Sequence, residues 1–236
     1  MTAVEVFGRR AGGGRLMDIV IVDHVKKYFE TGNRLVKAVD GVSLLVEKGK
    51  FTAIVGASGS GKTTLLNLIG GLYRPTGGRI IVDDTELSSL TEQELTIYRR
   101  RRVGFVFQDC SLVSELTVRE NILFPLALDD SRSDPVFFER ITGALRLDDK
   151  LDRYPHTLSA GTQQCAAIAR ALITKPSILL ADEPTGSLDV RTSQNVAGLL
   201  KMTTEMFHQT LIMITHSMEL AQLSDQVVRL QDGRIV

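Results

Sequence analysis

The sequence lacks an excess of either charge, because 28 lysines and arginines balance 28 aspartates and glutamates. A neutral chain has no general electrostatic attraction for nucleic acid or for an anionic membrane surface. Partners must therefore be inferred from particular sites, and we expect no nucleic-acid partner.

Cysteines are scarce and long apolar runs are missing. The two cysteines, Cys110 and Cys165, fit no zinc-binding spacing, and no segment resembles a secretory signal, so we expect a reducing compartment, the cytoplasm. No apolar run approaches the ~20 residues that cross a bilayer. Any association with a membrane would therefore go through another subunit.

The hydrophobic content is high, at 43% of 236 residues, which is enough to bury the core of one domain with subdomains. Residues 1–17 contain Gly12-Gly13-Gly14 and three arginines but no apolar core segment like that of a signal peptide. We expect them to form a flexible extension, with Met17 as an alternative start of the protein. The ordered domain would then cover residues 18–236.

The first half of the sequence predicts strands, a loop and a helix. Short β-branched runs at Asp18–Val25 and Ser43–Val46 predict an antiparallel β region. The apolar run Phe51–Val55 predicts a buried strand, which a glycine-rich turn joins to a helical pattern at Lys62–Ile69. A strand, a polar helix and another strand are then expected at Gly78–Asp83, Thr91–Arg100 and Val103–Phe107.

The middle of the chain has a different character. Residues 111–170 carry mostly helical patterns, with breaks expected at Pro125, Asp134-Pro135 and Tyr154-Pro155. We interpret this region as a helical insertion.

Strands return in the last third. Ser177–Ala181 and Thr210–Thr215 are predicted as buried strands with the helix Thr192–Met206 between them, and such a β-α-β connection implies a parallel sheet. Gln226–Leu230 and Arg234–Val236, on either side of an Asp-Gly turn, predict a closing hairpin.

The glycine-rich turn carries the clearest motif. Residues 56–63 match G-x-x-x-x-G-K-[ST], after a buried strand and at the start of a helix, which is the context that a phosphate-binding loop requires. Its amide hydrogens and the helix N-terminus would hold the phosphates of ATP, with Lys62 neutralising them and Thr63 binding Mg²⁺. The expected nucleotide-binding residues here are Gly56, Ser58, Gly59, Ser60, Gly61, Lys62, Thr63 and Thr64.

Two carboxylates end the buried strand near residue 180. Asp182 is expected to hold the magnesium shell, and Glu183 to act as general base or orienter for the attacking water. The alternative is an ordinary acidic pair at a strand end. We favour the catalytic interpretation because the chain also contains the phosphate loop.

Further motifs follow in an order that resembles the ATP-binding-cassette (ABC) ATPases from about Ile19 to Val236. Gln108, ending Gly104-Phe105-Val106-Phe107-Gln108, resembles the Q-loop glutamine, and Leu158–Gln164 resembles the signature loop. Ser187-Leu188-Asp189 resembles the D-loop, and His216 resembles the switch histidine.

The resemblance implies roles for these residues. Gln108 would contact magnesium and water and sense a transmembrane subunit, and a neutral His216 would hydrogen-bond the γ-phosphate. Ser159, Gly161 and Asp189 would help bind ATP across a head-to-tail dimer, in which the signature of one subunit closes over the phosphate loop of the other. Tyr28 would stack on adenine, although a core or surface tyrosine is the alternative.

The implied fold is α/β, a P-loop NTPase (RecA-like) core with a mostly parallel sheet. Residues 18–108 and 166–236 would form this core together with an N-terminal antiparallel β subdomain. Residues 109–165 would form an inserted helical subdomain that includes the signature loop.

Details of the motifs are similar to the lipoprotein-release, macrolide-export and cell-division ATPases, notably Tyr154-Pro155 and residues 181–189. This likeness implies an ATPase subunit on the inner face of the cell membrane, in a homodimer or heterodimer that energises an integral-membrane permease for transport or mechanical work. The alternatives are a soluble ABC ATPase not tied to transport, and a low-turnover, ATP-gated regulatory module.

The signature departs from the family's usual Leu-Ser-Gly-Gly-Gln followed by Gln-Gln-Arg. Ala160, Thr162 and Cys165 occupy three of its positions, so a Cβ crowds the phosphate approach, a long amide is lost and a cation is removed. We expect weakened signature function and slow turnover, or dependence on a partner with an intact signature.

The basic run Arg99–Arg102 is a candidate for nucleic acid or acidic lipid. It lacks interleaved aromatics and precedes a predicted strand, so we favour a solvated helix end.

Overall fold

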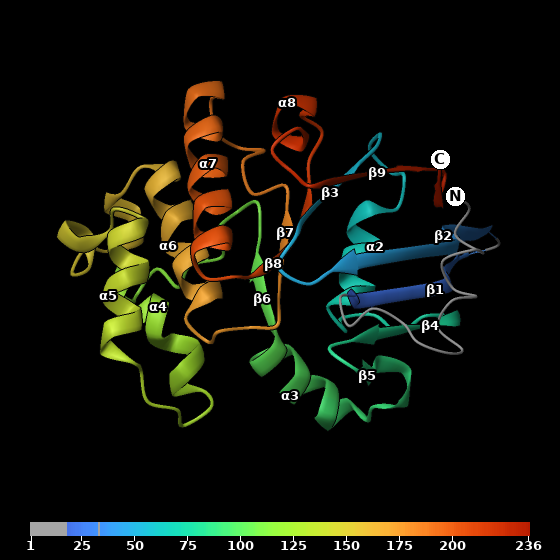
Figure 1. Ribbon diagram of the computed structural model, residues 1–236, viewed down its shortest axis with the longest axis horizontal. Helices are drawn as coiled ribbons and strands as arrows, with labels where there is room; N and C mark the ends of the chain where they lie inside the picture. Colours follow the sequence, from blue (N-terminus) through green and yellow to red (C-terminus); the bar gives the residue numbers. More distant parts are fainter. Residues whose placement is uncertain (1–17, 33) are drawn as a thin grey trace.

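A computed structural model describes residues 18–32 and 34–236, so the predicted flexible extension, 1–17, lies outside the described residues. Figure 1 shows an antiparallel sheet at one end, a group of helices at the other, and a second sheet between them. The fold therefore has the predicted layout of a β subdomain, a core and a helical region.

The antiparallel sheet has the strand order β2-β1-β4-β5. Its bounds are β1 Asp18–Thr31, β2 Arg34–Glu47, β4 Gly77–Val82 and β5 Thr85–Glu86. The β1–β2 hairpin is longer than predicted. Register shifts after Val22, Val25 and Lys27 interrupt the alternation of apolar and polar residues on which the prediction of strands depends. The strand pattern is therefore weak in the sequence although the pairing continues.

The second sheet has the order β10-β9-β3-β8-β7-β6, and all neighbouring strands in it are parallel except β9 and β10. The predicted buried strands and the closing hairpin are confirmed. Their bounds are β3 Phe51–Val55, β6 Val103–Val106, β7 Ile178–Asp182, β8 Thr210–Ile214, β9 Gln226–Gln231 and β10 Arg234–Ile235.

Helices cover both faces of this parallel sheet. On one face, α2 (Lys62–Ile69) and α3 (Glu92–Arg102) pack with the antiparallel sheet against side chains such as Ile54. On the other face lie α4 (Val118–Ala127), α5 (Pro135–Ala144), α6 (Ala160–Leu172) and α7 (Val190–Met206). Shorter helical segments are Leu87–Ser89, Asp148–Lys150, Pro155–Thr157 and α8, Met218–Ala221.

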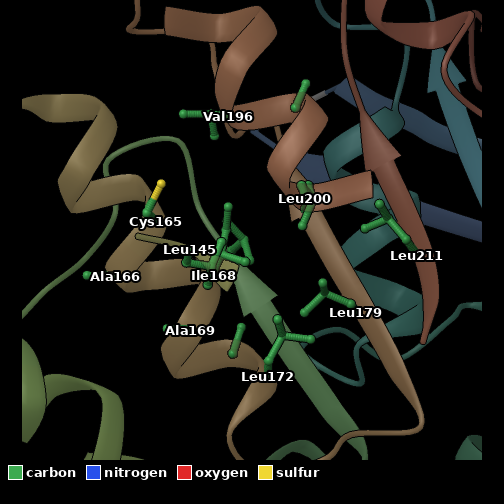
Figure 2. Packing of buried hydrophobic residues seen from close by; sticks show 14 of the residues in the cluster. Leu145, Cys165, Ala166, Ile168, Ala169, Leu172, Leu179, Val196, Leu200 and Leu211 are labelled. Atoms are coloured by element: carbon green, nitrogen blue, oxygen red, sulfur yellow. The ribbon is translucent and has the colours of Figure 1, made fainter. Parts of the chain in front are cut away.

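The core on the helical face joins α6 and α7 to the sheet. Figure 2 shows Leu172 of α6 beside Leu179 of β7, with Leu200 of α7 and Leu211 of β8 close by, and all four are almost fully buried. Successive residues of β3 point to opposite faces of the sheet: Ile54 packs in the cluster that contains α2, whereas Ala53 and Val55 pack in the cluster that contains α6. The helix after the phosphate loop and the signature helix therefore lie on opposite faces.

The predicted break at Pro125 is wrong, since α4 contains this residue and continues to Ala127. A proline in a helix removes one backbone donor and usually ends or kinks the helix. Here the helix ends only two residues later, so few helical hydrogen bonds lie beyond the proline. Asp134-Pro135 does start a new helix, with the Asp134 carboxylate accepting from the Phe137 amide at 3.2 Å. The proposed subdomain boundary at 165 and 166 lies inside α6, which is continuous.

In the part of the chain that the structure describes, no helix is both long and apolar enough to cross a bilayer.

Candidate active site

The phosphate loop lies between β3 and α2 and is pressed against two other strands. A Cβ on Gly56 would lie 2.1 Å from the carbonyl oxygen of Leu230 in β9, and a Cβ on Gly61 would lie 2.0 Å from that of Ala38 in β2. Gly61 also has φ +100°, in the region that favours glycine. Only glycine fits at both positions, so the packing of the loop explains its sequence.

Lys62 is buried inside the loop. Its ammonium donates to the carbonyl oxygens of Gly56, at 3.0 Å, and Ala57, at 2.8 Å. Among the described residues, the buried Ser60 hydroxyl has no hydrogen-bond partner. Ser58 and Gly59 are exposed, and Thr64 is half-buried in the first turn of α2. The loop therefore has a preorganised positive charge and an unused donor, as an anion site requires.

Asp182 and Thr63 meet at the carboxyl end of β7. The Thr63 hydroxyl donates to the Asp182 carboxylate at 3.3 Å. Burial raises the pKa of Asp182 above the usual carboxyl range, the Thr63 hydrogen bond opposes this rise, and the nearby Glu183 charge adds to it. A half-buried carboxylate beside a hydroxyl is a hard-oxygen donor pair, and it fits the predicted Mg²⁺.

Glu183 and His216 form the next pair, at the ends of the neighbouring strands β7 and β8. The His216 imidazole Nε2 contacts the Glu183 carboxylate directly. Glu183 has φ +48°, an unusual conformation for a residue with a side chain, and its amide donates to the Ile214 carbonyl oxygen at 3.1 Å. The backbone is thus bent so that the carboxylate faces the histidine.

Two cavities adjoin this pair. One, of about 520 Å³, is lined by Glu183, Thr215 and His216 together with residues of α7 and α8. The other, of about 410 Å³, is lined by Gly56, Ala57 and again His216. His216 therefore lines both cavities, one shared with Glu183 and the other with the phosphate loop. Its predicted hydrogen bond to the γ-phosphate stays a prediction.

Gln108 follows β6 and lies against the start of the D-loop. The Ser187 hydroxyl donates to the Gln108 carbonyl oxygen at 3.5 Å, and a Cβ on Gly186 would lie 3.0 Å from the Gln108 Nε2. The structure thus brings Gln108 close to the segment just after Glu183. Its predicted contact with magnesium stays a prediction.

Tyr28 is half-buried in β1, and its hydroxyl donates to Asp40 at 2.5 Å. Its predicted stacking on adenine stays a prediction.

The signature and the D-loop are joined through Thr192, a residue that the sequence did not single out. Ser159 caps α6, accepting from the Thr162 amide at 3.3 Å, and its hydroxyl lies 2.9 Å from the Thr162 hydroxyl. Asp189 caps α7, accepting from the amide of Thr192 at 3.0 Å and from its hydroxyl at 2.6 Å. A Cβ on Gly161 would lie 2.6 Å from the Thr192 methyl group.

A second connection that sequence reasoning missed links α6 to the segment after Gln108. The Gln164 amide donates to the Phe107 carbonyl oxygen at 3.0 Å, and the Cys110 thiol donates to the Gln164 side-chain oxygen at 2.7 Å. The Arg170 guanidinium donates to the carbonyl oxygens of Cys110 and Ser111. These partners are 54 to 60 residues apart, so no local sequence pattern could reveal them.

The basic run is occupied by contacts within the chain. Arg99 donates to the Gly71 carbonyl oxygen, and Arg102 pairs with Asp83 at 2.8 Å. Arg100 and Arg101 both pair with Asp129, the second residue after α4, at 3.2 and 2.9 Å. The run therefore joins α3 to the helical region, rather than being simply a solvated helix end.

Comparison with known proteins identifies the class. The family model described as "ABC transporter" matches residues 39–186, and the chain belongs to this family. The predicted resemblance to the ABC ATPases and the predicted fold class are confirmed.

Relatives differ in how much of their length the chain covers. It is 42% identical over 222 residues to the methionine import ATP-binding protein MetN of Haemophilus influenzae (strain 86-028NP), covering 92% of this chain and 64% of MetN. It is 40% identical to the macrolide export ATP-binding/permease protein MacB of Brucella melitensis, covering 92% of this chain but 34% of MacB. It is 36% identical to the lipoprotein-releasing system ATP-binding protein LolD 1 of Rhodopseudomonas palustris, covering 93% and 99%.

A solved structure shares the fold. The ATP-binding cassette MJ0796, described as a dimer in a post-hydrolysis state bound to ADP and Pi, superimposes with a TM-score of 0.81 at 35% identity. The match covers 92% of this chain and 96% of that one.

Proposed function

We propose that this chain is the ATP-hydrolysing subunit that energises a membrane permease, in an ABC transporter or a mechanotransmission complex. The observation that carries the proposal is the gathering of Lys62, Thr63, Asp182, Glu183 and His216 at the carboxyl ends of β3, β7 and β8. This edge of a parallel sheet is where α/β proteins bind ligands.

The residues divide the chemistry between them. The loop amides and Lys62 hold the phosphates, while Thr63, Asp182 and Gln108 would hold Mg²⁺, which would neutralise charge on the phosphates. Glu183 accepts a proton from the attacking water or orients it, and His216 positions the Glu183 carboxylate through their direct contact.

The proposal includes a head-to-tail dimer with two shared sites, formed with a second copy or with a related chain. The helix after the phosphate loop, α2, and the signature helix α6 pack on opposite faces of the sheet, so we infer that the signature of one chain does not lie over its own phosphates. A partner's Ser159 and Gly161 would complete each site. The dimeric description of the related cassette MJ0796 supports this arrangement.

We propose an integral-membrane permease as the partner, without assigning the direction of transport. MacB is named for both ATP binding and a permease, and this chain corresponds to 34% of it. MetN is named for import and MacB for export, so we propose coupling to a permease without choosing between them. The chain would act at the inner face of the cell membrane, on the cytoplasmic side.

Purified protein, alone and co-expressed with permeases encoded by neighbouring genes, tests the proposal. We expect Mg²⁺-dependent ATP hydrolysis, co-purification with one permease, and stimulation of hydrolysis by it. Lys62→Met should weaken ATP binding by roughly 10- to 100-fold, the range for lost charge-assisted hydrogen bonds, whereas the control Lys201→Met, on α7 with a side chain 39% exposed, should not. Normal ATP affinity in Lys62→Met, or no permease association, would contradict it.

A further inference from the structure

Asp40 joins two parts of the fold that are far apart in the sequence. Its carboxylate accepts a hydrogen bond from the Tyr28 hydroxyl in β1 at 2.5 Å and from the Arg234 guanidinium in β10 at 2.7 Å. Arg234 lies 194 residues after Asp40. The aromatic ring of β1 is therefore held by a carboxylate whose second partner belongs to the last strand.

The backbone of Asp40 continues this connection to the phosphate loop. The Asp40 amide donates to the Gly233 carbonyl oxygen at 2.8 Å, and the Gly233 amide donates to the Ser60 carbonyl oxygen at 3.0 Å. Next to Ser60, Gly61 packs directly against the Ala38 carbonyl oxygen. A continuous set of hydrogen bonds thus runs from the Tyr28 ring through Asp40 and the β9–β10 turn to the loop that binds phosphate.

The electrostatics keep these bonds formed. The Tyr28 hydroxyl and then Arg234 lower the pKa of Asp40 to about 2, so the carboxylate is charged at any physiological pH. The bond to Asp40 raises the pKa of Tyr28 above its usual value, so the phenol stays a donor. The Lys37 ammonium lies 5.5 Å from the centre of the same ring. The Tyr28 side chain is therefore held by the hydrogen bond of its hydroxyl to Asp40 and by the Lys37 ammonium over its ring.

A purely stabilising ion pair is the simpler explanation, because Arg234 alone could tie the hairpin to β2. That explanation is weak, since the Arg234 side chain is 68% exposed and exposed pairs contribute little. It also gives no reason for the phenol to share the carboxylate. Asp40, by contrast, is only 13% exposed and lies where ring, hairpin and loop meet.

We propose that Asp40 is a positioning residue for nucleotide binding, which holds the Tyr28 ring at a fixed place relative to the phosphate loop. The base and the phosphates of ATP then meet one preorganised unit, so less ordering is needed on binding. This inference rests on the proposed stacking of adenine on Tyr28.

Binding of two ligands, measured by calorimetry on the full chain, separates the possibilities. ATP has a base and phosphates, whereas inorganic triphosphate has phosphates only. Asp40→Ala and Tyr28→Phe should each weaken ATP by about 3- to 10-fold, the range for one hydrogen bond, and leave triphosphate affinity unchanged. The double variant should be no weaker than the weaker single one, because both changes remove the same bond.

Asp23→Ala is the matched control, since Asp23 also pairs with an arginine, Arg79, within the antiparallel sheet. It should change neither affinity. Equal loss of both ligands in Asp40→Ala would mean that Asp40 supports only the loop, and unchanged ATP affinity would mean that it supports only stability; either result overturns the inference.

Two variants of Tyr28 distinguish the remaining outcomes. Tyr28→Phe retains the ring and removes only the bond to Asp40, so it can replace Asp40→Ala in the experiment if that variant does not fold. Tyr28→Ala removes the ring and should weaken ATP on the order of tenfold, as loss of a stacked base does. If Tyr28→Ala binds ATP normally, the proposed adenine site is wrong; if it weakens ATP and Tyr28→Phe does not, only the inference about Asp40 is wrong.

Discussion

The His216 imidazole contacts the Glu183 carboxylate across the ends of β8 and β7. The two residues are 33 positions apart, but parallel pairing of β7 with β8 places the ends of these strands side by side. Each of the two adjoining cavities is lined by His216, and one is also lined by Glu183. A reaction at this edge would therefore meet both side chains together.

Glu183→Gln should stop hydrolysis and leave ATP binding intact. The amide keeps the size of the side chain but cannot take a proton, so we expect the rate to fall by roughly 100-fold or more. ATP should then accumulate on the protein and hold it as a dimer. Phosphate release, nucleotide content and mass in solution measure the three effects.

One further variant and one control accompany Glu183→Gln. His216→Ala should lower the rate because the Glu183 carboxylate loses the imidazole that positions it. The control Glu205→Gln, on exposed α7, should change nothing. Normal hydrolysis by Glu183→Gln would show that another group activates the water.

Removal of Mg²⁺ and removal of the Asp182 carboxylate should both lower the rate of ATP hydrolysis. Asp182 lies 3.3 Å from the Thr63 hydroxyl, and loss of a carboxylate that orients a metal typically weakens metal binding by about 10- to 100-fold. In Asp182→Asn, hydrolysis should require more Mg²⁺ to reach half its maximum. An unchanged Mg²⁺ dependence in a titration of activity would remove Asp182 from the metal site.

The altered signature gives a gain-of-function test. Thr162 is hydrogen-bonded to Ser159, so the serine hydroxyl predicted to face a partner's ATP is held within its own chain. Ala160→Gly with Thr162→Gln should remove the contact between the two hydroxyls, keep the bond from the residue-162 amide, and raise turnover by about 2- to 10-fold, the range for one net hydrogen bond. Turnover equal to that of the unaltered chain would refute the idea of a weakened signature.

Cys165 needs separate treatment within that test. Its side chain is buried, so Cys165→Arg must place a charge in the helical core, at a cost in stability. The triple variant with all three family residues should be faster than the unaltered chain if it folds, and its melting temperature decides whether the comparison is valid. The double variant supplies the test if the triple variant is unstable.

The sequence predicted those parts of the fold whose causes are local. Phe51–Val55 and Lys62–Ile69 match β3 and α2, because an apolar strand, a glycine turn and a helical pattern are each contained in a few residues. The ends of β1 and β2 and the passage of α4 through Pro125 could not be predicted, since bulges and tertiary packing override local preference there.

The same division applies to the site. Lys62, Asp182 and Glu183 could be predicted as site residues because each sits in a compact motif. The contacts of Asp40, Thr192 and Gln164 could not, because they join different elements, such as Arg234 in β10 to Asp40. No spacing within one segment indicates such contacts.

The two thiols, Cys110 and Cys165, should be unreactive in the folded protein. Their ionisation at alkaline pH should lower the free energy of unfolding. Burial raises the pKa of both Cys110 and Cys165 from 9.0 to about 11, with Asp109 adding to the rise at Cys110. At neutral pH the thiolate fraction, and hence the labelling rate with a disulfide reagent, should be lower than for a free thiol by on the order of 100-fold. Unfolding in denaturant should restore rapid labelling.

The sign of the pH effect follows from the same shift. Because the folded pKa lies above the unfolded one, the unfolded chain loses these protons first as pH rises. The thiols' contribution to the free energy of unfolding is therefore complete below about pH 9 and is lost as pH rises through about 11. Melting temperatures across this range should fall less in Cys110→Ser/Cys165→Ser, whose hydroxyls do not titrate there. Equal slopes in both proteins, or rapid labelling of the native chain, would mean that the thiols are accessible.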